Sequence, residues 1–328
     1  METSSTPKQD ISINLFDRAS PSEHQAPLSS WGNSKQKNVH HFRVNTQDGI
    51  SLAAVMYNPP NNTLVKTGSP RVIVINCAMG RTKEKYQPFA QFMANQGWVV
   101  LTYDYRGIGQ SKPEIIKGYQ AELIDWGRID TTAIVQWAHV HLNPSQLVIV
   151  GHSIGGQILG FMENCHLLNA AVLVGAQKGY WKYWGQLRRY GLWCFWKTFP
   201  LSVKLFNHYP LMRLAQCEPL PPGIALDWYR WGLTEEFTDR NHRSCDSLFA
   251  RYTGPMLSIS LGDDRVFAPK PSVDSLAAKY KSASLERWHI EPQELGVQAI
   301  GHSGFFDPSI GDKLLPRVLS WLDKFYEF

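Results

Sequence analysis

The sequence predicts an α/β protein in which a mostly parallel, doubly wound sheet carries an inserted helical cap. Short apolar runs recur along the chain and alternate with longer amphipathic segments, a pattern typical of strands joined by crossover helices. Residues 178–250 interrupt this alternation between two core strands, so we interpret them as the cap and assign residues 39–177 and 251–328 to the core. A chain of 328 residues is long enough for one large domain with such an insertion.

The first part of the chain is expected to contain an extension and a β-hairpin. Residues 1–38 are polar and lack a sustained period, which predicts a flexible N-terminal extension. The segments His41–Thr46 and Ile50–Tyr57 both have strand-like patterns, and Asp48-Gly49 between them is a favoured hairpin turn.

Core strands and helices are predicted in alternation after the hairpin, apart from the interruption at the cap. The strands are short apolar runs: Arg71–Asn76, Trp98–Tyr103, Leu147–Val150, Ala171–Val174, Met256–Leu261 and Leu285–Ile290. The helices are expected near Lys85–Asn95, Ala121–Leu142, Ile154–His166 and Ser272–Tyr280, with a final helix from Lys313.

Charge and metal-ligand content argue against several classes of function. The net charge of +5 is small and spread along most of the chain, so a nucleic-acid partner is not expected. The five cysteines contain no Cys-x-x-Cys pair, which predicts neither a disulfide framework nor a zinc site and suits a reducing compartment. His139 and His141 are two residues apart on a predicted helix and point in different directions, so they should not share a metal. We therefore expect no metal and no organic cofactor.

The sequence also predicts a soluble, cytoplasmic protein. Its first residues include Glu2, Asp10 and Asp17 without an apolar run, so we expect no signal peptide. No uninterrupted apolar stretch approaches the roughly 20 residues that cross a bilayer.

The strongest chemical motif is Gly151-His152-Ser153-Ile154-Gly155, which matches the pattern G-x-S-x-G. It follows a predicted strand and precedes a predicted helix, as a nucleophile elbow requires. The glycines leave room for a sharp turn that raises the serine hydroxyl above the sheet, and the helix directs its first N–H groups toward developing negative charge. The alternative is an ordinary glycine-rich turn between a strand and a helix. We take Ser153 as the candidate nucleophile.

A serine nucleophile needs a base and an acid that orients the base. The expected order is serine, acid, histidine, and the chain provides Asp263 and Asp264 after one late strand and His302 in a glycine-rich loop after the next. Neighbouring residues on a turn usually point apart, so only one carboxylate should reach His302. The spacing Asp264-x-Val-x-x-Pro favours Asp264, and loop hydrogen bonding is the alternative role for the other carboxylate.

An oxyanion hole needs two backbone N–H groups. Ile154, the residue after the nucleophile, should provide one. The loop after the strand Arg71–Asn76 should provide the other, through Met79 or, as the alternative, Ala78. The nearby segment Tyr103–Ser111 lacks the third glycine of a dinucleotide-binding loop, so we interpret it as a structural turn in which Asp104 and Arg106 pair.

These motifs together resemble the α/β-hydrolase superfamily over about residues 40–325. More narrowly, three motifs are similar to a bacterial group of predicted hydrolases with no assigned substrate: Gly151–Gln157, Gly301–Phe306 and Leu220–Trp231. The loop Asp104–Ser111 also looks like the superfamily's Asp-x-Arg-Gly-x-Gly-x-Ser. The resemblance implies an α/β-hydrolase fold and assigns Ser153, Asp264 and His302 to a catalytic triad. One difference is that Cys77-Ala78 replaces the His-Gly that many members carry after the first parallel strand.

The predicted cap is unusually aromatic. Nine of the 23 residues in Lys178–Pro200 are aromatic, and no acidic residue lies between Lys178 and Glu218. Three interpretations stay open: a helical cap packed on the core, an apolar wall for an acyl or aromatic substrate that includes Trp181 and Trp184, or an amphipathic peripheral contact with an anionic membrane surface.

The function that these features favour is hydrolysis of a carboxylic ester, or of an amide or thioester, through an acyl-enzyme. The expected partner is a small-molecule acyl substrate, and the aromatic composition of the cap favours an apolar one. One alternative is an acyltransferase on the same fold, and another is a catalytically silent module that only binds.

Overall fold

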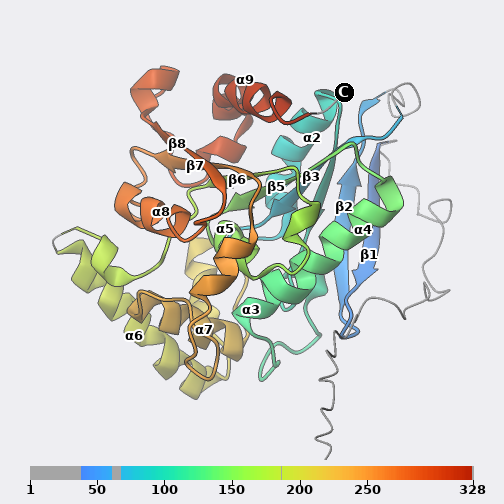
Figure 1. Cartoon of the computed structure of the whole chain (residues 1–328). Coiled ribbons are helices and arrows are strands. Elements are labelled where there is room, and N and C mark those ends of the chain that lie inside the picture. The colour runs from blue at the N-terminus through green and yellow to red at the C-terminus, as the bar shows by residue number, and fades with distance from the viewer. Residues whose placement is uncertain (1–37, 61–67, 186, 327–328) are drawn as a thin grey trace, which may run out of the picture. The chain divides into compact units, whose positions relative to one another are not determined.

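The computed structural model describes residues 38–60, 68–185 and 187–326, which carry an eight-stranded sheet (Figure 1). The strand order is β1-β2-β4-β3-β5-β6-β7-β8. The predicted extension, residues 1–38, lies outside the described residues except for Asn38.

The predicted hairpin is confirmed. Strands β1 (Val39–Asn45) and β2 (Ser51–Tyr57) pair antiparallel, and β2 then pairs antiparallel with β4 (Trp98–Tyr103). In β1 only Phe42 and Val44 are buried, at alternate positions, as expected for a strand with one face on the core.

The remaining pairings are parallel, and every predicted core strand is confirmed with small shifts of its ends. The strands are β3 (Arg71–Asn76), β5 (Gln146–His152), β6 (Ala170–Val174), β7 (Pro255–Leu261) and β8 (Ser284–Ile290). The chain passes from β3 to β4 on one side and then to β5 on the other. The order therefore reverses at β3, and the carboxyl ends of the strands there form the edge at which such sheets bind ligands.

The core helices follow the predicted alternation. They are α2 (Gln87–Asn95), α3 (Leu123–Asp125), α4 (Thr132–Leu142), α5 (Ile154–Ile158), α8 (Lys270–Ala277) and α9 (Pro308–Asp323), with a π-helical turn η5 (Trp126–Thr131) between α3 and α4. Short 3-10 turns are η3 (Lys83–Tyr86), η4 (Gly109–Ser111), η6 (Leu159–Phe161), η7 (Cys165–Leu167), η11 (Pro292–Leu295) and η12 (Gly304–Phe306).

Two predicted helix boundaries are wrong. The helix after Ser153 ends at Ile158 instead of His166, and the chain is extended at Met162. The glycines in this stretch have low helix propensity, and a Cβ at Gly160 would lie 2.5 Å from the Phe249 ring, so close packing determines the path here. The last helix begins at Pro308, earlier than predicted, because Asp307 caps it by accepting a hydrogen bond from the Ser309 N–H.

Between β6 and β7 the chain forms helices instead of core strands. They are η8 (Trp181–Tyr183), α6 (Arg188–Phe206), η9 (Pro210–Ala215), α7 (Pro222–Leu233) and η10 (Asp246–Arg251). Helix α6 packs on α7, with the Trp196 and Trp228 ring centroids 5.0 Å apart. This segment corresponds to the predicted cap, residues 178–250.

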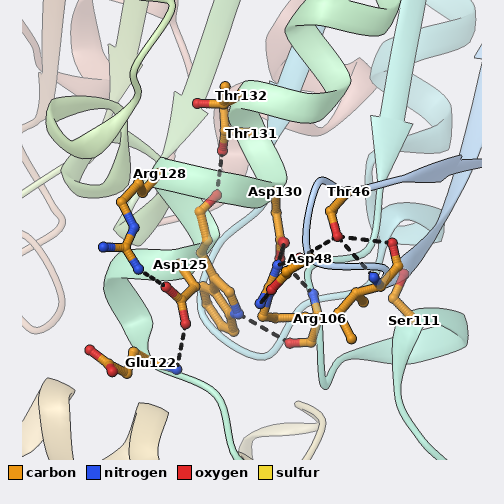
Figure 2. Close-up of polar contacts among 12 residues, drawn as sticks. Thr46, Asp48, Arg106, Ser111, Glu122, Asp125, Arg128, Asp130, Thr131 and Thr132 are labelled. Atoms are coloured by element: carbon orange, nitrogen blue, oxygen red, sulfur yellow. Dashed lines mark hydrogen bonds and ion pairs between the residues drawn. The ribbon is translucent and has the colours of Figure 1, made fainter. Parts of the chain in front are cut away.

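The predicted pairing of Asp104 with Arg106 is wrong. Figure 2 shows Arg106 between Asp48 and Asp130, with ion-pair distances of 2.7 Å to both carboxylates. Asp104 instead binds the buried Lys83 ammonium at 2.7 Å. Burial raises the pKa of Asp130 to about 7, although the Arg106 guanidinium opposes that shift. Arg106 therefore joins the hairpin turn to the π-helical turn, a long-range contact that spacing within one loop does not predict.

Candidate active site

Ser153 occupies a strained turn between β5 and α5. Its φ of 55° and ψ of −117° place a non-glycine residue in a conformation that L-residues rarely adopt. Glycine is needed nearby, because a Cβ at Gly155 would lie 2.3 Å from the carbonyl oxygen of Asn76. These are the features of a nucleophile elbow.

His302 and Asp264 form a close pair. His302 Nδ1 lies 2.5 Å from Asp264 Oδ2, and the other carboxylate oxygen of Asp264 accepts hydrogen bonds from the N–H groups of Phe267 (3.1 Å) and Ala268 (3.2 Å). The carboxylate can only accept when it is ionised, so Nδ1 carries the proton. Nε2 is thereby left unprotonated in the neutral ring, which is the form that a general base requires.

Asp263, the neighbouring carboxylate, contacts the same loop in a different way. Its Oδ2 accepts hydrogen bonds from the N–H groups of Ile300 (2.8 Å) and Gly301 (2.9 Å). Asp264 therefore contacts the His302 ring, whereas Asp263 holds the backbone that leads to it. This is the loop hydrogen-bonding role that the sequence offered for the second carboxylate.

No hydrogen bond joins Ser153 to His302 among the described residues. The Ser153 Oγ instead lies 3.5 Å from both the oxygen and the nitrogen of the Gln177 side-chain amide. Gln177 is buried and follows β6, which pairs with β5. Sequence reasoning missed it, although its position after a strand that neighbours β5 was a usable signal.

The loop after β3 provides a candidate oxyanion hole. The N–H of Ala78 donates to the Tyr86 hydroxyl oxygen at 2.7 Å, so it is already used. The N–H groups of Met79 and Ile154 have no hydrogen-bond partner among the described residues. Because an oxyanion needs unoccupied donors, this arrangement favours Met79 over Ala78 as the partner of Ile154.

A buried hydrogen-bond chain that the sequence did not reveal joins the three loops of the site. The Tyr86 hydroxyl lies 2.8 Å from His152 Nδ1, and His152 Nε2 lies 2.9 Å from the carbonyl oxygen of His302. A carbonyl can only accept, so Nε2 donates to it, Nδ1 is the acceptor, and the tyrosine donates to Nδ1. Burial and the nearby His302 lower the pKa of His152 well below its usual value. His152 therefore stays neutral and connects Ser153, His302 and the oxyanion loop.

The two cap tryptophans singled out in the sequence lie in different surroundings. Trp184 is buried, and its indole N–H donates to the carbonyl oxygen of Val266 at 2.7 Å, on the loop that follows Asp264. Trp181 is half-buried, with its ring near those of Tyr180 and Tyr190. Contact of either tryptophan with a substrate stays a prediction.

The described residues contain no group of three or more His, Cys, Asp or Glu side chains that could hold a metal ion. Cys77, Cys165, Cys194 and Cys245 are free thiols. Among the helices of the described residues, none combines the length and apolar character that crossing a membrane requires.

One protein family matches part of the chain. The model of the family described as serine aminopeptidase, S33, matches residues 68–211, which include Ser153 but neither Asp264 nor His302. This match to a hydrolase family supports the prediction of a hydrolase. Among curated proteins, none matches the chain.

Solved structures share the fold across most of the chain. An esterase from Pyrococcus furiosus is 14% identical with a TM-score of 0.57, covering 90% of this chain and 98% of that one. A hypothetical protein from Pseudomonas aeruginosa is 17% identical with a TM-score of 0.59, covering 89% and 95%. An esterase from Exiguobacterium antarcticum is 14% identical with a TM-score of 0.53, covering 86% and 98%. The sheet and the likeness to these structures show that the chain has an α/β-hydrolase fold, and the family match covers residues 68–211 of it.

Proposed function

We propose that the chain is a serine hydrolase that cleaves carboxylic esters through an acyl-enzyme. The observation that carries this proposal is the Asp264–His302 pair, 2.5 Å apart, at the same sheet edge as a serine held in an elbow conformation. Ionised carboxylate, neutral imidazole and raised hydroxyl are the three groups that serine acyl transfer requires. The likeness of the fold to two esterases supports an ester substrate.

In the proposed acylation, Ser153 Oγ attacks the ester carbonyl carbon while His302 Nε2 takes the hydroxyl proton. The N–H groups of Met79 and Ile154 stabilise the oxyanion that forms. The tetrahedral intermediate then collapses, the bond to the alcohol oxygen breaks, and His302 returns the proton to that oxygen. Asp264 accepts from Nδ1 throughout and stabilises the charged imidazolium.

In the proposed deacylation, His302 takes a proton from water as the water oxygen attacks the acyl carbon. The bond to Ser153 Oγ breaks, the serine regains its proton from His302, and the carboxylic acid leaves. Before the first step the Ser153 hydroxyl must turn from Gln177 toward His302, because it lies near Gln177 in this structure. Hydrogen bonds between catalytic groups are often incomplete without a substrate.

The aromatic residues of the cap favour an apolar acyl group. Trp184 contacts the loop that carries Asp264, and the Phe267 ring on that loop lies 5.2 Å from the His302 ring. An acyl chain that leaves Ser153 on this side would meet aromatic surface, and burying it there would contribute binding free energy in proportion to its apolar area.

The test is a series of chromogenic esters of graded acyl length, assayed with wild type, Ser153→Ala and Ser145→Ala. Ser145 precedes β5, at the end of the strand opposite Ser153, and serves as the matched control. We expect hydrolysis by wild type and Ser145→Ala and its loss in Ser153→Ala. Aminoacyl amides cleaved faster than esters would overturn the ester assignment. Acyl transfer to an added alcohol or amine in preference to water would indicate an acyltransferase, and absence of any turnover would indicate a binding module.

A further inference from the structure

Helix α6 and its N-cap residue carry an exposed, mostly apolar stripe, which we call the outer face: Leu187, Tyr190, Trp193, Cys194, Lys197, Leu201, Lys204 and Leu205. These positions recur every three or four residues and therefore lie on one side of the helix. The residues of α6 that are buried are Trp196, Phe199 and Ser202, which lie on the opposite side. Figure 1 shows α6 alongside α7, onto which that buried side packs.

The outer face is more apolar than a water-facing helix surface normally is. Leu187, Leu201 and Leu205 are 82%, 60% and 65% exposed. Of the eleven large apolar side chains that are exposed in the described part of the chain, seven lie between Leu187 and Phe206. Single exposed apolar residues are normal on proteins, but a contiguous group of them marks an interaction surface.

The charged residues of α6 are all cationic. Lys197 and Lys204 lie on the outer face, and Arg188 lies at its N-terminal end. No acidic residue occurs between Lys178 and Glu218, and none of these three cations forms an ion pair with a carboxylate among the described residues. Arg188 donates to the carbonyl oxygen of Arg265, and Lys197 lies over the Trp193 and Tyr229 rings, and none of these partners carries a negative charge.

We propose that the outer face of α6 docks on an anionic lipid surface. Leucine and tryptophan side chains would enter the boundary between headgroups and acyl chains, while the cationic groups at the ends of long aliphatic stems would reach anionic headgroups. A second copy of the chain fits less well. Symmetric pairing of two outer faces would bring their lysines together without any carboxylate between them.

The N-terminal end of α6 and the segment before it contact the loop that follows Asp264. Arg188 donates to the Arg265 carbonyl, and Trp184 donates to the Val266 carbonyl. Val266 and Phe267 are exposed, and the Phe267 ring contacts that of His302. If the proposed function holds, docking would present the entrance of the site to the lipid surface, so that an apolar ester reaches Ser153 from the lipid phase. This extension rests on the proposed function, whereas the docking itself does not.

The test is co-sedimentation of the full chain with vesicles, using Ser153→Ala as the background so that no lipid is hydrolysed. Vesicles contain phosphatidylcholine alone or with about 30 mol% phosphatidylserine. We expect binding to the anionic vesicles that weakens with salt. Adding Leu201→Glu with Leu205→Glu should lower the partition coefficient at least tenfold. Lys197→Gln with Lys204→Gln should lower it about 25-fold on anionic vesicles, at about fivefold for each charge.

The matched control is Val140→Glu, at an exposed apolar position on α4, which should bind as the background does. Circular dichroism and melting temperature show whether each variant folds. Equal sedimentation of the background and the folded double-glutamate variant would overturn the proposal. So would a concentration-dependent dimer that the double-glutamate change abolishes and that does not bind vesicles. Because binding is measured without turnover, a failure of the proposed esterase activity would leave these results unaffected.

Discussion

Helices α5 and α6 differ in how completely the rest of the chain covers them. All five residues of α5 are buried, whereas α6 buries three of its 19 residues. In α5, neighbouring strands and loops determine every position, which holds the strained Ser153 in place. In α6, packing on α7 uses one side only and leaves an apolar side facing outward. The comparison shows why we place the proposed chemistry beside the fully buried α5 and the proposed docking surface on the partly exposed α6.

The largest expected effect comes from substitutions in the candidate triad beside the buried α5. Ser153→Ala or His302→Ala should each lower kcat by a factor on the order of 10⁴ to 10⁶, because neither group acts without the other. The double variant should lose little more than the single ones. Steady-state kinetics on one ester would measure this, and losses that simply multiply would contradict a single catalytic unit.

The second prediction separates the two adjacent carboxylates. Asp264→Asn should lower kcat on the order of 10⁴-fold, because an amide favours the wrong tautomer of His302. Asp263→Asn should cost under about tenfold, because the hydrogen bonds of Asp263 join its Oδ2 to the backbone of the loop and not to the His302 ring. Circular dichroism of both variants excludes a misfolded loop. A larger loss from Asp263→Asn would reverse the assignment.

The third prediction concerns the neutral His152. The pKa of His152 is lowered in the folded state. Below pH 6.5, the ordinary pKa of histidine, the His152 ring is therefore protonated in the unfolded chain while it stays neutral in the folded chain. Protonation of His152 in the unfolded chain therefore lowers the free energy of unfolding at acid pH. The full stability is present above about pH 6.5 and is lost as the pH falls below it, at up to about 1.4 kcal/mol per pH unit. Urea unfolding at pH 7 and pH 5.5 should show a smaller loss for His152→Asn than for wild type. An equal loss in both would mean that His152 is not held neutral.

The smallest expected effect concerns the cap tryptophans and the length of the acyl chain. Each methylene added to the acyl chain should raise kcat/KM roughly fourfold until the pocket is full, at about 0.8 kcal/mol per group. Trp181→Ala should flatten this slope and leave acetyl esters nearly unchanged. Trp184→Ala should also lower the melting temperature, because Trp184 is buried and hydrogen-bonded to Val266. If kcat/KM of wild type does not change with acyl length and the variants lose only stability, the aromatic residues of the cap serve packing alone.

The sheet was predictable because parallel strands buried on both faces appear as continuous apolar runs, such as Arg71–Asn76 and Trp98–Tyr103. Once the strands were predicted, Ser153, Asp264 and His302 could be placed in order, because each lies in a turn or loop after one of them. Asp264 was separated from Asp263 by spacing, and the contact with His302 agrees with that choice.

Other features depend on contacts between distant segments and were missed or mistaken. Arg106 pairs with Asp48 and Asp130 instead of the nearby Asp104, because the folded chain brings a hairpin turn and a π-helical turn to it. The hydrogen bonds from Tyr86 through His152 to the His302 carbonyl join three loops that are distant in sequence. For the cap, composition indicated an aromatic, basic segment, but which side of α6 stays exposed depends on its packing against α7.

The most direct test of the proposed triad is covalent labelling with a fluorophosphonate, followed by peptide mapping by mass spectrometry. The account predicts one label per chain, on Ser153, with none on Ser153→Ala and much slower labelling of His302→Ala, where no base activates the hydroxyl. Labelling of another residue, or a folded wild-type protein that takes up no label, would contradict it.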